Sequence, residues 1–194
     1  TIACACAGII IGSVFVSGLG LKFTQSVIDL SGGVLFILLC LTAVSAIILG
    51  MGMTTTAVYI TVAALIVPSL IESGIMPIAA HMFAFYFGVV STITPPVALA
   101  SFAGAAIAKS PPMATAVESS KVGIAKYIVP FAFVYNPSLL MEGPIIWSIY
   151  SLISVLFAYW SMTLGLEGWF NGKLNVFKRI LAILSSVTLL VPPL

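Results

Sequence analysis

Charged side chains are scarce in this sequence of 194 residues. Only 6% of the residues are Asp, Glu, Lys or Arg, whereas 61% are hydrophobic and the mean hydropathy is +1.27. A soluble globular domain carries about 25% charged residues, so this chain has too few to cover a surface that faces water. The composition predicts an all-α integral membrane protein, and we expect no nucleic-acid partner.

Residues that carry out intramembrane chemistry are equally scarce. The chain has one His, His81, and one Asp, Asp29, which lies in a predicted polar connection at residues 22–31. Aspartyl catalysis needs two carboxylates, and zinc or haem ligation needs several His or Cys at suitable spacing. We therefore expect neither an enzyme nor a cofactor. Cys4, Cys6 and Cys40 are interpreted as small packing residues, and His81 as an interfacial residue with proton coupling as the alternative.

Long apolar runs divide the chain into membrane segments, since a spanning helix needs about 20 apolar residues. We expect a span, a hairpin, a broken helix, a cytoplasmic arm and a further span, at residues 2–19, 34–71, 82–108, 109–126 and 127–141. These would form one unit over residues 1–145, followed by additional transmembrane helices in 146–194. The chain begins at Thr1 without Met and ends inside an apolar segment, so we expect a fragment of a longer protein.

Basic residues fall unevenly between these segments. One side of the membrane receives only Lys22. The other side receives Lys109, Lys121, Lys126, Lys173, Lys178 and Arg179. The positive-inside rule places this second set in the cytoplasm, so residues 109–126 are predicted to be cytoplasmic and residues 72–81 periplasmic.

The segment 34–71 has two interpretations, because both return the chain to the same side. It is either two full spans with a cytoplasmic turn or a re-entrant hairpin with a buried tip. Its limbs, residues 34–49 and 57–71, reach about 23–24 Å at 1.5 Å per residue, short of a hydrocarbon core of about 30 Å. The turn between them carries no charge. Both observations favour the re-entrant hairpin.

A polar interruption lies inside the apolar run 82–108, where the sequence reads STITPP. The two prolines supply no N–H, disfavour the helical conformation before them, and deprive carbonyls about four residues upstream of their partners. Together with the hydroxyls, these carbonyls form a cluster of oxygen dipoles that suits Na⁺. The alternative is a proline kink patched by Ser and Thr bonding back onto their own helix. The candidate cation ligands and helix breakers are Ser91, Thr92, Thr94, Pro95 and Pro96.

A second interruption, GMGMTTT, forms the tip of the predicted hairpin. Its glycines permit tight backbone geometry. Its threonines stand at the N-terminus of the next limb, where free N–H groups and the positive end of the helix dipole would stabilise an anionic substrate group. The alternative is a capped turn. The candidate binding residues are Gly50, Gly52, Thr54, Thr55 and Thr56.

Discontinuous helices that meet near mid-membrane typically bind the substrate and ion of a secondary transporter. Two stretches, GMGMTTTAVYI and FYFGVVSTITPPVALASFAGAAIA, resemble the large (DctM-like) membrane subunit of tripartite ATP-independent periplasmic (TRAP) transporters, of the type in which the small and large subunits are fused. AAHMFAFYFG and YIVPFAFVYNPSLL extend the resemblance over residues 1–145. The family usually reads Gly-Met-Gly-Leu-Pro-Thr-Thr at the tip, whereas Thr54 stands here where Pro is expected.

The resemblance implies an elevator-type secondary transporter of a bacterial or archaeal inner membrane, of which this chain carries the second inverted half. Such a permease would import an organic acid with a cation gradient, usually Na⁺, with H⁺ as the alternative. It would receive the acid from a soluble periplasmic binding protein and would need a small membrane subunit or its fused equivalent. Other possibilities are a divalent-anion sodium symporter without a binding protein, an ion channel, and a non-transporting membrane anchor.

The uneven distribution of basic residues generates a first prediction. In a variant that lacks the three cysteines, a thiol at Ser120→Cys should be labelled only from the cytoplasmic side, and a thiol at Ser73→Cys only from the periplasmic side. Labelling of intact cells and of inverted vesicles with an impermeant maleimide measures this. Labelling from outside at Ser120→Cys, with none at Ser73→Cys, would reverse the whole orientation.

Overall fold

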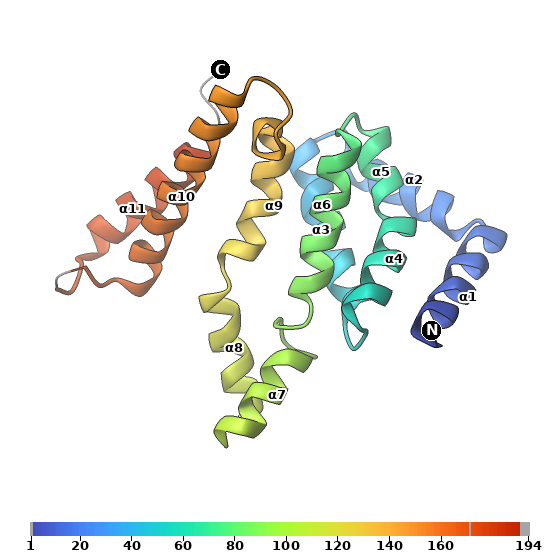
Figure 1. Ribbon diagram of the computed structural model, residues 1–194, viewed down its shortest axis with the longest axis horizontal. Coiled ribbons are helices and arrows are strands. Elements are labelled where there is room, and N and C mark those ends of the chain that lie inside the picture. The colour runs from blue at the N-terminus through green and yellow to red at the C-terminus, as the bar shows by residue number, and fades with distance from the viewer. Residues whose placement is uncertain (1, 171, 191–194) are drawn as a thin grey trace. The chain divides into compact units, whose positions relative to one another are not determined.

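The computed structural model describes residues 2–170 and 172–190, and this part of the chain is almost wholly helical (Figure 1). Within it, the only extended pairing is a single bridge between Trp169 and Lys173. The helices are, in chain order, α1 (Ile2–Ser17), α2 (Leu19–Ser31), α3 (Leu35–Gly50), α4 (Thr55–Leu65), α5 (Val67–Glu72), α6 (Pro77–Val90), α7 (Leu99–Ala108), α8 (Pro112–Val122), α9 (Ala125–Tyr135), the 3₁₀ helix η1 (Pro137–Leu140), α10 (Ile145–Glu167) and α11 (Val176–Leu190).

The chain divides into two compact units, Thr1–Pro130 and Phe131–Leu194, with the boundary inside α9. Both predicted interruptions fall in the first unit: one separates α3 from α4, and the other separates α6 from α7. The second unit contains η1, α10 and α11. The candidate site therefore belongs to the first unit alone.

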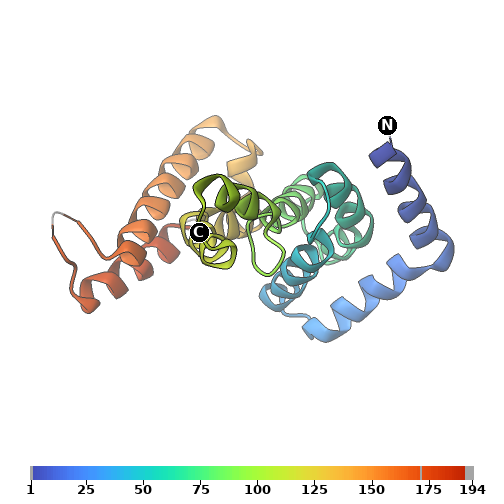
Figure 2. The same cartoon turned by 90° about the horizontal axis from the view of Figure 1, so that it is seen from below.

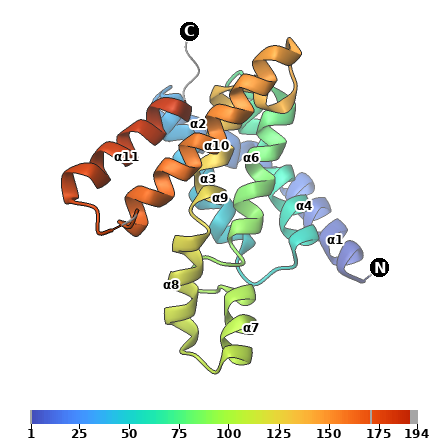
Figure 3. The same cartoon turned by 60° about the vertical axis from the view of Figure 1, so that its left-hand side comes forward.

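Helices α3, α4 and α6 form the core of the first unit and lie side by side in Figures 1 and 3. In lipid, helices associate mainly through close van der Waals packing rather than through the hydrophobic effect. Tight interdigitation is therefore what joins the hairpin to the helix that leads into the break. The buried side chains of these three helices include Leu38, Leu39, Ala46, Val58, Val62, Phe83 and Ala84.

The second limb of the hairpin is not one continuous helix. α4 ends at Leu65 and α5 begins at Val67, with Ile66 between them. Pro68 lies in the first turn of α5 and has no N–H to give to the carbonyl of Ala64, so the helical ladder is interrupted there. Residues 57–71, predicted as one limb, therefore form two helices that meet at Ile66.

Residues 22–31, predicted as a polar connection, form most of helix α2. The helix buries Thr24, Val27 and Ser31, whose spacing of three and four residues places them on one face. Gly18, with a φ of 65°, makes the corner between α1 and α2 (Figure 2). The stretch is polar because its other face is exposed, not because it lacks regular structure.

Among the described residues, one helix is long and apolar enough to cross a membrane by itself. This is α10, with 23 residues. α3, α4, α6 and α7 are apolar but shorter, with 16, 11, 14 and 10 residues. At 1.5 Å per residue they reach about 15–24 Å, so each would need a neighbouring segment to complete a crossing of about 30 Å.

An arginine joins the ends of α10 and α11 in the second unit. Arg179 donates hydrogen bonds from Nε to the carbonyl of Gly165 at 2.9 Å and from a terminal nitrogen to that of Leu166 at 2.7 Å. Gly168, with a φ of 68°, ends α10, and a Cβ there would lie 2.9 Å from Arg179 Nε. The arginine therefore satisfies carbonyls that the last turn of α10 leaves free.

Replacing Arg179 with Gln should loosen the turn between α10 and α11. The two lost hydrogen bonds are worth about 1–2 kcal/mol after allowing for partial exposure. Their loss should raise the fraction of molecules in which this turn is locally unfolded by a factor of about 5–30. Amide hydrogen exchange over residues 165–176 of the full-length protein should accelerate accordingly. Lys178→Gln, at the neighbouring exposed cation, is the control; equal exchange in the two variants would refute the capping role of Arg179.

Candidate ion and substrate site

The break between α6 and α7 is a short non-helical segment. α6 ends at Val90 and α7 begins at Leu99, and a loop joins them (Figure 3). The peptide bond between Pro95 and Pro96 is cis. The N–H of Ala100 bonds to the carbonyl of Thr92 at 3.0 Å and closes the segment into a loop. The predicted helix breakers therefore lie inside a real discontinuity.

The three hydroxyl groups of the break donate to carbonyls of the turn before them. The bonds run from Ser91 Oγ to Gly88 at 2.6 Å, from Thr92 Oγ1 to Val89 at 2.8 Å and from Thr94 Oγ1 to Val90 at 2.7 Å. This is the back-bonding expected of a patched kink. A hydroxyl that donates its proton still keeps two acceptor lone pairs, so the same three oxygens can also face a cation.

The backbone carbonyls of the break are only partly satisfied. The prolines remove the N–H groups that would reach the carbonyls of Ser91 and Thr92. The carbonyl of Thr92 accepts from Ala100 instead, and that of Ile93 accepts from the hydroxyl of Ser120 at 3.0 Å. Within the described residues no donor reaches the carbonyl of Ser91. The predicted set of freed carbonyls is therefore smaller than the prolines alone suggest.

The hairpin tip places its threonines at the N-terminus of α4. Thr54 is the residue before the helix, and its φ of −71° is an angle that proline also adopts. Thr54 therefore has a φ within the range that the proline expected from the resemblance would also require. Thr54, Thr55 and Thr56 are all exposed in this chain, so its described residues do not cover them, and the burial of the tip stays a prediction.

The structure brings the two interruptions into direct contact. Gly50, the last residue of α3, lies so close to Ser91 that an added Cβ would meet Ser91 Oγ and would stand 2.8 Å from Ser91 Cβ. An added Cβ at Gly52 would lie 3.9 Å from a methyl of Val97. Ser91 is completely buried, whereas Thr92 and Thr94 are half-buried. The only ligands that these two elements offer are neutral oxygens and the N–H groups at the start of α4.

Tyr127 makes a contact with the break that the sequence does not predict. Its hydroxyl lies 2.6 Å from Thr94 Oγ1. A cavity of about 390 Å³ borders Thr94, Ser120 and Tyr127. A separation of 33 residues between Thr94 and Tyr127 leaves no local sequence signal for this contact. His81, which was treated as interfacial, bonds through Nδ1 to the hydroxyl of Tyr59 at 3.1 Å.

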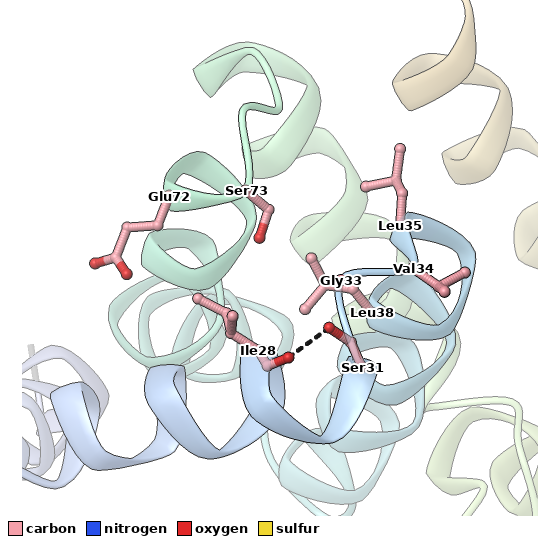
Figure 4. A pocket seen from close by; sticks show the side chains of 8 residues that line it. All are labelled: Ile28, Ser31, Gly33, Val34, Leu35, Leu38, Glu72 and Ser73. Atoms are coloured by element: carbon pink, nitrogen blue, oxygen red, sulfur yellow. Dashed lines mark hydrogen bonds between the residues drawn. The ribbon is translucent and has the colours of Figure 1, made fainter.

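A second cavity lies at the base of the hairpin, away from both interruptions. It measures about 260 Å³, and Figure 4 shows residues of the α2–α3 turn on one side of it and Glu72 and Ser73 on the other. The hydroxyl of Ser31 already bonds to the carbonyl of Ile28 at 2.6 Å. No predicted site residue lines this cavity. Among the described residues, no group of three or more His, Cys, Asp or Glu could hold a metal ion.

An uncharged site built from two helix discontinuities is characteristic of membrane transport proteins. Residues 1–148 match the family model described as "Tripartite ATP-independent periplasmic transporter, DctM component". No match is found among curated proteins or among solved structures. The chain therefore belongs to the DctM family. It is a membrane component of a TRAP transporter, and this family is one of transporters rather than of enzymes.

The contact between Gly50 and Ser91 generates a stability prediction. Gly50→Ala should destabilise the full-length protein by about 1–3 kcal/mol, because the new methyl group overfills the space that Ser91 occupies. Thermal unfolding in detergent measures this. Gly104→Ala is the control, since nothing lies within 4 Å of a Cβ at that helical glycine.

A second replacement tests whether the loss arises from this contact. Ser91→Gly removes both atoms that the new methyl would strike, so the double variant should be more stable than the sum of the two single effects predicts. If the losses of stability in the two single variants simply added in the double variant, the two interruptions would not meet in this way. The same would follow if Gly50→Ala were as stable as Gly104→Ala.

Proposed function

We propose that this chain is the second inverted half of an elevator-type TRAP permease that imports an organic acid of the dicarboxylate class by symport with Na⁺. The observation that carries the proposal is the contact of Gly50 with Ser91. It unites two oxygen-rich discontinuities whose chemistry is complementary. One offers oxygen ligands for a cation, and the other offers a helix N-terminus for an anion.

The cation would bind at the break between α6 and α7. Ser91, Thr92 and Thr94 retain lone pairs after donating to the preceding turn, and the carbonyl of Ser91 has no donor within the described residues. Na⁺ is a hard cation that prefers such oxygens, and neutral ligands leave its charge to be balanced by an anionic substrate. Binding of cation and substrate would therefore be mutually favourable, as symport requires.

The carboxylate of the substrate would lie at the hairpin tip. α4 begins at Thr55, and the carbonyl of Thr54 accepts from the N–H of Val58 at 2.9 Å. The N–H groups of Thr55, Thr56 and Ala57, which precede this first helical bond, have no acceptor within the helix. These groups and the helix dipole attract negative charge. Thr54, Thr55 and Thr56 are exposed, so their hydroxyls are open to a ligand from the side that this chain leaves uncovered.

The short apolar helices support a re-entrant hairpin. The 16 residues of α3 extend about 24 Å, less than the hydrocarbon core. We propose that α3 and α4 enter and leave the membrane on the periplasmic side, that the unit carrying them moves as the elevator, and that α10 and α11 belong to the fused C-terminal part. A periplasmic binding protein and a small or fused membrane subunit would complete the transporter in the inner membrane.

Replacing Thr94 with Val tests the cation site, because valine keeps the shape and removes one oxygen. Loss of one ligand should cost about 1–3 kcal/mol, which is a weakening of apparent Na⁺ affinity of about 5- to 150-fold. The Na⁺ concentration for half-maximal uptake of a labelled dicarboxylate, in proteoliposomes with the full-length permease and its binding protein, should rise accordingly.

Thr163 provides a matched control. Its hydroxyl also donates to a carbonyl four residues earlier, that of Tyr159 at 3.0 Å, but it does so within the unbroken helix α10. Thr163→Val should leave the Na⁺ dependence unchanged. If Thr94→Val also left it unchanged and only lowered stability, Thr94 would be part of a patched kink and not a ligand.

A further inference from the structure

The region where α8 meets α9 holds the break through two hydroxyl groups. Ser120 Oγ donates to the carbonyl of Ile93 at 3.0 Å, and the hydroxyl of Tyr127 lies 2.6 Å from Thr94 Oγ1. The carbonyl of Ile93 belongs to the peptide bond that joins Ile93 to Thr94, and Thr94 is the residue immediately before Pro95. Two adjacent groups of the break are therefore bonded to the same neighbouring segment.

A close packing contact adds to these bonds. Gly123 ends α8, and a Cβ at this position would lie 2.7 Å from Cδ1 of Ile93. The absence of a side chain at Gly123 lets Ile93 pack against the backbone of the segment that also carries Ser120 and Tyr127. Ser120 thus bonds to the main chain of Ile93, and Gly123 packs against its side chain. A movement of the segment that carries Ser120 and Gly123 would therefore move the break with it.

Either hydroxyl of the Tyr127–Thr94 pair can donate to the other. The carbonyl of Val90, 2.7 Å from Thr94 Oγ1, can only accept. When Thr94 gives its one hydroxyl proton to this carbonyl, Tyr127 is the donor to Thr94 Oγ1. The oxygen of Thr94 then has one lone pair left. The hydrogen bonds to Val90 and Tyr127 prevent the hydroxyl from rotating freely, so they set the direction of this lone pair.

We propose that Tyr127 is a positioning residue of the cation site: it orients the remaining lone pair of Thr94, and Ser120 holds the adjoining carbonyl. The inference rests on the proposed function, because it takes Thr94 to be a cation ligand. It goes further in assigning a role to the α8–α9 segment, whose displacement would turn Thr94 away from the cation. The cavity of about 390 Å³ beside these residues leaves room for such a displacement.

The direct probe is Na⁺ itself. The full-length protein in detergent is unfolded thermally at increasing NaCl, with choline chloride holding the total salt constant, and the Na⁺ concentration for half-maximal stabilisation reports apparent affinity. Tyr127→Phe removes only the hydroxyl and should raise this concentration about 2- to 12-fold, the worth of one ordinary hydrogen bond. Tyr150→Phe, at an exposed tyrosine of α10, should leave it unchanged.

Two further variants separate positioning from general stabilisation. The double variant Thr94→Val with Tyr127→Phe should bind Na⁺ no more weakly than Thr94→Val alone, because Tyr127 acts only through the threonine oxygen. Ser120→Ala should shift the Na⁺ dependence in the same direction as Tyr127→Phe, and it provides the same test if the Tyr127 variant does not fold.

The outcomes distinguish this inference from the proposed function. If Na⁺ stabilises the unmodified protein no better than choline, the proposed Na⁺ site is wrong, and the inference fails with it. If Thr94→Val weakens Na⁺ stabilisation while Tyr127→Phe and Ser120→Ala lower only the melting temperature without Na⁺, the site stands and the positioning role is overturned. Additive effects of Thr94→Val and Tyr127→Phe on Na⁺ affinity would also overturn it.

Discussion

Backbone polar groups that a helix cannot satisfy are the constraint on which this structure depends. A free N–H or C=O costs several kcal/mol in hydrocarbon, and Pro95 with Pro96 prevents α6 from continuing into α7. The chain responds with three hydroxyls that bond backwards, one N–H from α7 and one hydroxyl from α8. The break is tolerated because α7 and α8 supply hydrogen-bond donors to its carbonyls. These bonds also fix the positions of α7 and α8 beside the break.

Glycine is what allows these elements to come close enough. A Cβ at Gly88 would lie 2.7 Å from a methyl of Val58, and Gly50 and Gly123 are equally confined against Ser91 and Ile93. Three segments (the hairpin tip, its second limb and the end of α8) therefore come close to α6 or to the break, and in each contact one of the two residues is a glycine. Because helix association in lipid relies on van der Waals contact, these glycines set how closely the segments approach.

The same arrangement would allow the proposed site to be uncharged and still bind an ion and a substrate. Membership of the DctM family makes the chain a transporter component, and the contact at Gly50 joins its two oxygen-rich elements. Neutral ligands avoid burying a permanent charge, which would be costly when no ion is bound. A site of this kind can bind and release a cation together with an anion without leaving an unpaired charge on the protein.

Much of the local structure could be predicted from sequence. The shortage of charge indicated helices in a membrane, and Pro95, Pro96 and the GMGMTTT stretch marked both interruptions, because prolines and glycines act on the backbone where they stand. The helical nature of residues 22–31 was missed, since their buried face is narrow. The bend at Ile66 was not predicted, because Pro68 is a single proline inside a largely apolar run and no cluster of polar residues marks a break there.

Sequence alone thus determined the class of protein, the positions of the breaks and the residue types that could bind an ion and an anion. Only the tertiary structure decided that Gly50 meets Ser91, that Thr94 bonds to Tyr127, and that the threonines of the tip remain uncovered. The physical reason is the range of the forces involved. Helix breaking is a property of neighbouring residues, whereas contacts across 33 or more residues depend on how complete helices pack, which no local pattern encodes.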